Sequence, residues 1–351
     1  MHYKIGYWPY GAGLDKAGDR RRFVFYAKEK HVQYEIANSQ KEYDLVYLTM
    51  GCNIADWLAY KKKFPAVRIV YEIIDSYFFQ KPGILTRSMG LIRFLIGKES
   101  TLYFNYVSAI KQMLTVADAV VCSSESQRQF ILAFNKNTHV SLDYFDNELT
   151  HRKTEYNSSG KLKLVWEGQA YTVRNLLKIK EVFRRLADKV ELHVITDPVI
   201  IYPFKIFNKK TSRVLDNIPC DVYYYPWEKE TFSQHIAAAD LAIIPIDKQD
   251  GLHWNKPENK LLLLWQVGIP VLTSDTPAYK NVMTNAGIPF LCSNIDEWET
   301  AINNYINMPE AERQLIAGKA ANYLNWHHTK ELIIKNWDSI FTSVVNNWVK
   351  Q

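Results

Sequence analysis

Short runs of β-branched and aromatic residues alternate with helical stretches along most of the chain, and this alternation constrains the fold more than any other feature. It is typical of parallel sheets that are covered by helices. Several of the runs lack polar alternation, as expected for strands buried on both faces. The predicted strands form two series, at residues 3–8, 33–37, 45–49, 68–74 and 119–123, and at residues 163–167, 191–196, 221–225, 241–245 and 270–274.

The polar segment between the two series, residues 147–163, contains Asn157-Ser158-Ser159-Gly160 and is the best linker candidate. A chain of 351 residues is about twice the usual size of a single domain. We therefore expect an N-terminal α/β domain at 1–155 and a second one at 156–329. Residues 330–351 have the apolar spacing of an amphipathic helix, which is expected to pack back on the first domain.

The net charge of +6 is mild, and the basic runs at residues 20–22 and 61–63 are short and expected to be solvated. This pattern speaks against nucleic-acid binding, but it suits a phosphate-bearing partner or an anionic membrane surface. The four cysteines are far apart without metal-ligand spacing, which favours reduced thiols and a cytoplasmic location. The N-terminus does not read as a signal peptide, and no apolar run approaches the roughly 20 residues that span a bilayer. We expect a soluble protein, or one that is peripheral on the inner face of the plasma membrane.

The most informative motif follows the predicted strand at 241–245. A polar loop leads to a helix that begins near Pro257 and stops at Gly268. The N-terminus of a helix presents unpaired N–H groups and the positive end of its dipole, so it binds phosphate well. Lys256 and Lys260 flank this turn and add positive charge. A surface helix with two solvated lysines fits this stretch equally well.

This motif resembles the donor domain of retaining GT-B glycosyltransferases, in which a segment of the form PNKLFEYLAAGKPVV holds the nucleotide-sugar diphosphate and ribose. The matching residues run from Glu258-Asn259-Lys260-Leu261 through Gly268-Ile269-Pro270-Val271. The resemblance implies that Lys260 contacts a donor phosphate. The glutamate that bonds the ribose in this family is Leu263 here, so we expect Glu258 or Asn259 to bond it.

A second match begins at the predicted strand 163–167 and resembles the first strand, loop and helix of the same donor domain. Gly168 is expected to let the backbone approach the ligand. The family's lysine aligns with Arg174, which keeps the charge, and its arginine aligns with Gln169, which loses it. Trp227 follows the strand at 221–225, where the family's loop meets the nucleotide base. A solvated helix start for Arg174 and ordinary packing for Trp227 are the alternatives.

In the first half of the chain, a loop with Gly11 and Gly13 matches the family's loop that approaches the sugar and the acceptor, although a plain turn also fits. Asp75 follows the strand at 68–74, where a carboxylate can bond a sugar hydroxyl or accept the acceptor's proton. A helix N-cap is the other interpretation of Asp75. The apolar and basic segment at 82–114 is either an interfacial helix on an anionic membrane or a core helix with a basic rim.

The resemblance covers nearly the whole chain and implies two Rossmann-like domains facing a cleft. It also implies a retaining, hexosyltransferase-type enzyme that moves a sugar from a nucleotide-diphosphate sugar to a saccharide or lipid-linked acceptor, in surface polysaccharide or glycoconjugate synthesis. Asp75, Arg174 and Lys260 are the expected catalytic residues, and neither a metal nor another cofactor is expected. Leu263 and Gln169 leave a second interpretation open, a catalytically degenerate binding subunit or glycan reader.

Overall fold

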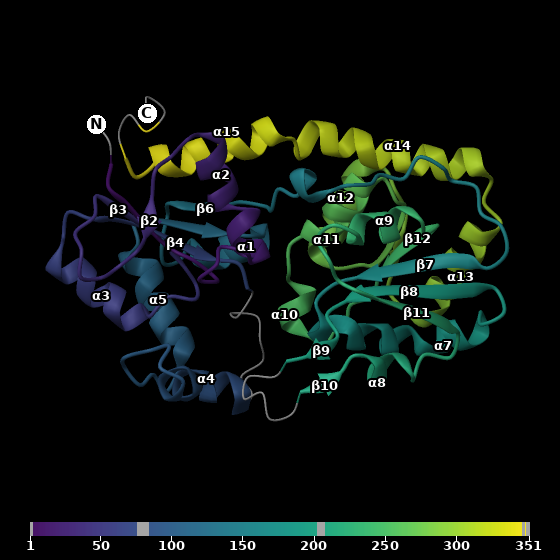
Figure 1. The fold of residues 1–351 in the computed structure, drawn as a ribbon, viewed down its shortest axis with the longest axis horizontal. Coiled ribbons are helices and arrows are strands. Elements are labelled where there is room, and N and C mark those ends of the chain that lie inside the picture. The colour runs from purple at the N-terminus through teal and green to yellow at the C-terminus, as the bar shows by residue number, and fades with distance from the viewer. Residues whose placement is uncertain (1–2, 76–83, 202–207, 346–347, 349–351) are drawn as a thin grey trace. The chain divides into compact units, whose positions relative to one another are not determined.

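The structure is a computed structural model that describes the chain except for residues 1–2, 76–83, 202–207, 346–347 and 349–351 (Figure 1). The chain divides into two compact units. Unit 1 comprises residues 1–144, 251–257 and 330–351, and unit 2 comprises residues 145–250 and 258–329. Each unit is built around a parallel sheet of six strands, so the predicted pair of doubly wound α/β domains is confirmed.

The sheet of unit 1 has the strand order β2-β1-β3-β4-β5-β6. Its strands are β1 (Ile5–Trp8), β2 (Glu35–Ile36), β3 (Leu45–Thr49), β4 (Arg68–Ile73), β5 (Ala119–Cys122) and β6 (Thr138–Val140). Its helices are α1 (Ala17–Arg20), α2 (Phe23–Glu29), α3 (Ile54–Lys63), α4 (Ile84–Leu95), α5 (Tyr106–Val116), α6 (Glu125–Ile131), α10 (Gly251–Trp254) and α15 (Lys330–Thr342).

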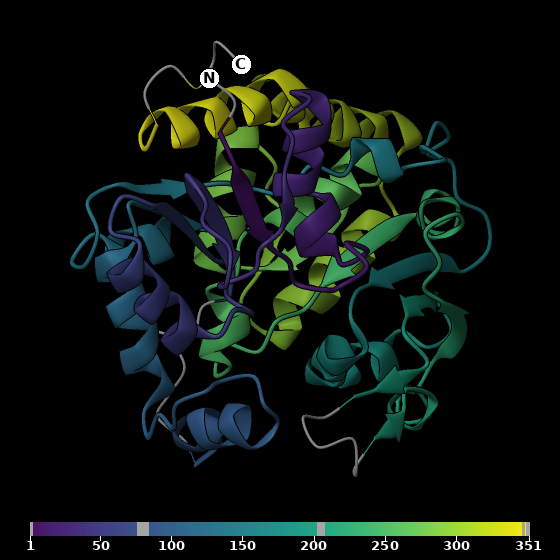
Figure 2. The ribbon, with the colours of Figure 1, turned by 60° about the vertical axis from the view of Figure 1, so that its left-hand side comes forward.

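Strand β3 shows why this sheet is covered on both faces. All five of its residues are buried, and successive side chains point to opposite faces, so Leu45 and Tyr47 join one apolar cluster and Val46 and Leu48 the other. Helices α2 and α15 cover the first face, and α3 and α5 cover the second, as Figures 1 and 2 show. Helix α15 contributes Trp337, which is completely buried, at the spacing that the sequence predicts.

The main sheet of unit 2 has the order β11-β8-β7-β12-β13-β14, and β9 and β10 form a small hairpin. Its strands are β7 (Leu162–Glu167), β8 (Val190–Thr196), β9 (Val199–Ile200), β10 (Lys209–Lys210), β11 (Asp221–Pro226), β12 (Leu241–Ile244), β13 (Val271–Ser274) and β14 (Leu291–Cys292). Its helices are η2 (Asp146–Glu148), η3 (Ala170–Ile179), α7 (Lys180–Arg185), α8 (Ser212–Leu215), α9 (Phe232–Ala237), α11 (Asn259–Val267), α12 (Pro277–Ala286), α13 (Ile295–Ile306) and α14 (Glu310–His327).

In unit 2, the start of one helix differs from the sequence-based expectation and the end of another agrees with it. The helix predicted from Arg174 onward begins earlier, at Ala170, and runs as a 3-10 helix before it becomes α7. Helix α11 ends as predicted at Gly268, whose φ of 90° lies in the left-handed region that favours glycine. None of the helices in the described part of the chain has the length and apolar character needed to cross a membrane.

Candidate functional site

The strand order of unit 2 indicates where a ligand is expected to bind, at the carboxyl ends of its central strands. Strand β7 lies between β8 and β12, so the chain first winds outward through β8 and β11 and then returns to the other side of β7. In open α/β sheets, ligands bind beyond the carboxyl ends of the strands at such a switch point. The loops after β7 and β12, together with the start of α11, are therefore the candidate site.

Lys260 and Gly168 come together at this edge. The Lys260 ammonium lies over the ring of Trp166 on β7, 4.7 Å from the ring centroid. A Cβ atom on Gly168 would lie under 3.0 Å from Lys260 Nζ and 3.2 Å from the Trp166 ring. Glycine at position 168 therefore leaves room for the Lys260 ammonium. The ring of Trp166, which is only 1% exposed, packs against the same ammonium.

The start of α11 carries the other residues that the motif singled out. Leu262 N–H donates to the carbonyl of Glu258, which is the N-cap, and the Glu258 side chain makes no capping hydrogen bond. Burial raises the pKa of the Glu258 carboxyl, which favours its neutral form. Asn259 is the first residue of the helix. Leu263, at the position of the family's ribose-binding glutamate, is 3% exposed and packs inside the unit.

Arg174 and Gln169 belong to the loop and helix that follow β7. Both side chains are exposed, and Gln169 is the N-cap of η3 without a side-chain capping bond. The backbone N–H of Ala170, at the first position of η3, donates to Asp197 Oδ2 at 3.3 Å. Asp197 follows β8 directly, so its carboxylate fixes the loop after the neighbouring strand.

Sequence reasoning missed an ion pair at the same edge. Lys178 Nζ on η3 lies 2.6 Å from Asp247 Oδ2 in the loop after β12, and the Lys178 ammonium lowers the pKa of Asp247. The pair connects segments on both sides of the switch point. The positions of Asp247 and Asp197 shortly after predicted strands were the signal that could have identified them.

Trp227 lies at the end of β11. Its backbone N–H donates to the carbonyl of Thr196 at 3.0 Å, and its ring stacks on Phe232 with centroids 5.3 Å apart. One face of the indole therefore packs within unit 2. The role of Trp227 at a nucleotide base stays a prediction.

The remaining predicted residues belong to unit 1. Gly11 N–H donates to the carboxylate of Asp19 at 3.1 Å, and Gly13 is exposed in the same loop. Lys256, expected beside Lys260, is assigned to unit 1, where its Nζ lies 3.4 Å from Asp75 Oδ1. The predicted helix start after Asp75 falls on residues 76–83, outside the described residues.

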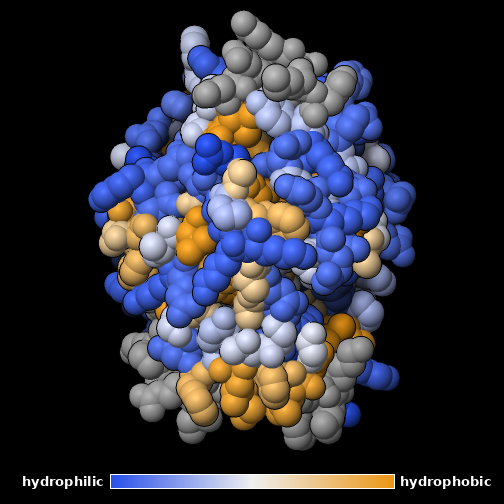
Figure 3. Space-filling model, turned by 90° about the vertical axis from the view of Figure 1, so that its left-hand side faces the viewer, coloured by the Kyte–Doolittle hydropathy of each residue, from blue (hydrophilic) through white to orange (hydrophobic). Residues whose placement is uncertain are grey.

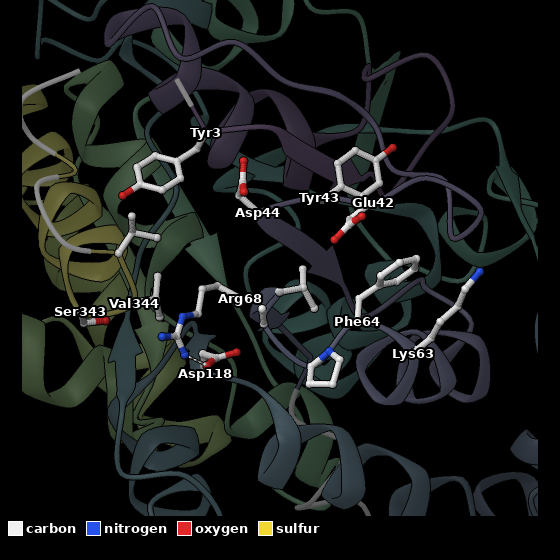
Figure 4. Close-up of a pocket in the computed structure, with 14 residues that line it drawn as sticks. Tyr3, Glu42, Tyr43, Asp44, Lys63, Phe64, Arg68, Asp118, Ser343 and Val344 are labelled. Atoms are coloured by element: carbon white, nitrogen blue, oxygen red, sulfur yellow. Dashed lines mark hydrogen bonds and ion pairs between the residues drawn. The ribbon is translucent and has the colours of Figure 1, made fainter. Parts of the chain in front are cut away.

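A hollow of about 670 Å³ lies at the opposite edge of the unit 1 sheet, before β3, β4 and β5 begin (Figure 4). Asp118 lies in its wall and accepts hydrogen bonds from Arg68, Lys61 and the backbone N–H of Ile69. Burial alone would raise the pKa of Asp118, but these three donors together lower it. Ligands of such sheets bind at the carboxyl ends of the strands, so this hollow lies at the end of the sheet opposite to the candidate site.

Comparison with known proteins identifies the fold. No protein-family model and no curated protein sequence matches the chain. Among solved structures, Anabaena HepE in complex with UDP and glucose is 14% identical with a TM-score of 0.65, and the match covers 97% of this chain and 100% of HepE.

Two further glycosyltransferase structures align with most of the chain. WaaG, a glycosyltransferase involved in lipopolysaccharide biosynthesis, is 14% identical with a TM-score of 0.52 and coverage of 96% and 99%. TarM from S. aureus, in a complex with UDP, is 13% identical with a TM-score of 0.55, and the match covers 85% of this chain and 55% of TarM. This chain thus spans about half the length of TarM. The predicted resemblance is confirmed at the level of the fold: the chain has the GT-B fold of these glycosyltransferases, two Rossmann-like units each built on a parallel sheet of six strands.

Proposed function

We propose that the protein is a glycosyltransferase that takes its sugar from a nucleotide-diphosphate donor bound in unit 2. The observation that carries this proposal is the position of Lys260, at the start of α11 and beside Gly168 at the switch-point edge of the sheet. An ammonium group and the positive end of a helix dipole together favour a diphosphate at this place. HepE, which shares the fold, is described in complex with UDP-glucose.

In the proposed reaction, the bond between C1 of the sugar and the diphosphate oxygen breaks, and its electron pair leaves with the diphosphate. The acceptor's hydroxyl oxygen forms the new bond to C1, and Asp75 takes its proton. Lys260, Arg174 and the N-terminus of α11 stabilise the negative charge that develops on the diphosphate. Glu258 or Asn259, at the start of α11, bonds the ribose hydroxyls. We propose that the reaction proceeds with retention and without a metal.

Isothermal titration with UDP, GDP, ADP and TDP tests the donor site. We expect one of these nucleotides to bind, and Lys260→Met to weaken it by about 10- to 100-fold, because the charge-assisted bond is lost while the side-chain stem remains. Lys189→Met is the matched control, since Lys189 is exposed and precedes β8 at the amino end of that strand. If none of the four nucleotides binds the wild type, the donor site does not exist.

The same purified protein, incubated with nucleotide sugars, separates the enzyme from the catalytically degenerate alternative. Release of the nucleoside diphosphate, by transfer or by slow hydrolysis, supports the enzyme. Tight binding without turnover of any nucleotide sugar supports a binding subunit or glycan reader. We propose a saccharide or lipid-linked acceptor in surface polysaccharide or glycoconjugate synthesis, in line with the lipopolysaccharide role named for WaaG.

An apolar surface on unit 1 supports a membrane-bound acceptor and a place on the inner face of the plasma membrane. Exposed apolar side chains gather at the end of α4 and in the loop that follows it. Figure 3 shows an orange, apolar patch at the bottom of the view. The exposed side chains are Leu91, Phe94, Leu95, Ile96, Leu102 and Phe104. Between residues 81 and 111 the sequence has five basic residues and a single acidic one, Glu99, which is buried and paired with Arg93. This charge suits an anionic membrane.

Vesicle co-sedimentation tests this surface. We expect the protein to sediment with phosphatidylglycerol-containing vesicles and not with pure phosphatidylcholine vesicles. Leu95→Ser with Phe104→Ser should abolish sedimentation, because these side chains are 67% and 86% exposed. Ile36→Ser is the control, since Ile36 is 49% exposed on β2 in the same unit. Equal sedimentation of the double variant and the wild type would remove the membrane from the proposal.

A further inference from the structure

The loop after β1, residues 9–14, donates backbone hydrogen bonds to a buried carboxylate. Asp19 is completely buried and accepts hydrogen bonds from the hydroxyl of Tyr7 at 2.6 Å and from the backbone N–H groups of Tyr10 at 2.8 Å and Gly11 at 3.1 Å. Strand β1 lies between β2 and β3, so this loop follows the switch point of the unit 1 sheet. The carboxylate therefore fixes the backbone at the place where the fold positions a ligand.

A second carboxylate holds the same loop through a side chain. Glu72, at 1% exposure near the end of β4, accepts from the Tyr10 hydroxyl at 2.6 Å, from Arg22 Nε at 2.9 Å and from the hydroxyl of Tyr47. The Tyr10 ring packs so closely on Gly18 that a Cβ there would lie 2.6 Å from it. The loop thus has one fixed side-chain anchor in addition to its two fixed N–H groups.

Arg22 completes the network and corrects the expectation that residues 20–22 form a solvated basic run. Its side chain is completely buried, and beyond Glu72 its Nη1 donates to the carbonyl of Ser141 at 2.8 Å and to Asp143 at 3.1 Å. Burying charged groups costs free energy that their pairing only partly offsets, so such a network is weak evidence for a purely stabilising role. The network is hydrogen-bonded to the loop that follows β1 at the carboxyl ends of the strands, which favours a role in positioning that loop.

We propose that Asp19 and Tyr10 are positioning residues that hold the loop at residues 9–14 for the transfer reaction. This inference rests on the proposed function. Ala12 and Gly13 are exposed, and within the described part of the chain no hydrogen bond engages their backbone N–H groups. With Tyr10 and Gly11 fixed, these two N–H groups are held in place to donate to oxygen atoms of the sugar substrate. Asp19 and Tyr10 act through the loop and do not touch the substrate.

The test compares Tyr10→Phe and Asp19→Asn with the wild type in donor binding and in turnover. An asparagine in place of Asp19 keeps one acceptor oxygen but presents an NH2 group where the carboxylate received an N–H. We expect each substitution to lower kcat by about tenfold, while the dissociation constant for the nucleoside diphosphate, bound in unit 2, changes by less than about twofold. Tyr43→Phe is the control, because its hydroxyl donates to Glu35 at 2.7 Å, away from the loop at residues 9–14, and turnover should not change.

Wild-type turnover in both variants would overturn the inference, and so would a parallel loss of nucleotide binding and turnover, which indicates general damage. Failure of the wild type to bind any nucleotide would instead overturn the proposed function. In that case hydrogen exchange still decides the positioning role. Peptides that cover residues 9–14 should exchange about tenfold faster in Asp19→Asn than in the wild type or in Tyr43→Phe, and unchanged exchange would refute it.

Discussion

Replacing Gly168 by alanine perturbs the proposed donor site at a single atom. The new Cβ would lie under 3.0 Å from Lys260 Nζ, whereas ordinary contacts begin at 3.4 Å, so the ammonium must retreat by several tenths of an ångström or more. The side chain of Lys260 can do so because Nζ is its flexible end. The ring of Trp166, at 3.2 Å from the new Cβ and 1% exposed, has little room to move. Gly168→Ala should therefore displace the ammonium and also cost some stability, because the buried ring must give by a few tenths of an ångström.

The size of the effect follows from the interaction that the displacement removes. A hydrogen bond to a charged group contributes about 1.5–3 kcal/mol, which corresponds to a loss of about 10- to 100-fold in affinity for the nucleoside diphosphate. Isothermal titration of Gly168→Ala, Lys260→Met and the double variant measures it as a cycle. We expect the double variant to bind no more weakly than Lys260→Met, because both changes remove the same contact.

Gly318→Ala in α14 serves as the control, since a Cβ there meets nothing within 4 Å and a helical alanine should raise stability slightly. Two results would refute the reasoning. One is unchanged nucleotide binding by Gly168→Ala, which would mean that the position of the ammonium is unimportant. The other is a double variant whose loss equals the sum of the single losses, which would mean that Gly168 acts independently of Lys260.

Three further predictions concern unit 1. The donors around Asp118 lower its pKa, so its contribution to stability is present above the unfolded carboxyl pKa of about 4 and is lost as the pH falls. Asp118→Asn should therefore lower the free energy of unfolding by about 1–3 kcal/mol in urea denaturation at pH 7, and by much less at pH 3. Gly90→Ala places a Cβ against the backbone carbonyl of Tyr103, which cannot yield, so proteolysis in the segment after α4 should accelerate, and an unchanged digestion pattern would contradict the packing. Trp337→Ala should lower the free energy of unfolding by about 3–5 kcal/mol in thermal melts, because the ring is completely buried, and a change below about 1 kcal/mol would show that α15 contributes little to the core.

The sequence was sufficient to predict the architecture because local signals and burial agree along the chain. Strands such as β3 and β12 are continuous apolar runs that are buried on both faces. The end of α11 at Gly268 was predictable because only a residue that tolerates positive φ ends a helix in this way. Lys260 and Gly168 were both assigned to the donor site from the resemblance, but the sequence did not predict that the Lys260 ammonium lies beside Gly168.

The buried polar network was beyond sequence reasoning, because its partners are far apart in the chain. Arg22 and Glu72 are separated by 50 residues, and Arg22 and Asp143 by 121. A run of three arginines reads locally as a solvated surface, and only the tertiary fold shows that the third of them is buried. The sequence also could not predict that Lys256 belongs to unit 1 and Lys260 to unit 2, because the two residues are only four positions apart.

The discontinuity of unit 1 has a consequence for biosynthesis. Residues 1–144 emerge from the ribosome first, yet the apolar face around Phe23 and Tyr26 is covered by Trp337 and Phe341, which are translated after all of unit 2. At a translation rate of about 5–20 residues per second, this face remains uncovered for about ten seconds or more. We therefore expect chaperones, or partial collapse of the nascent N-terminal half, to cover this apolar face until α15 has been translated.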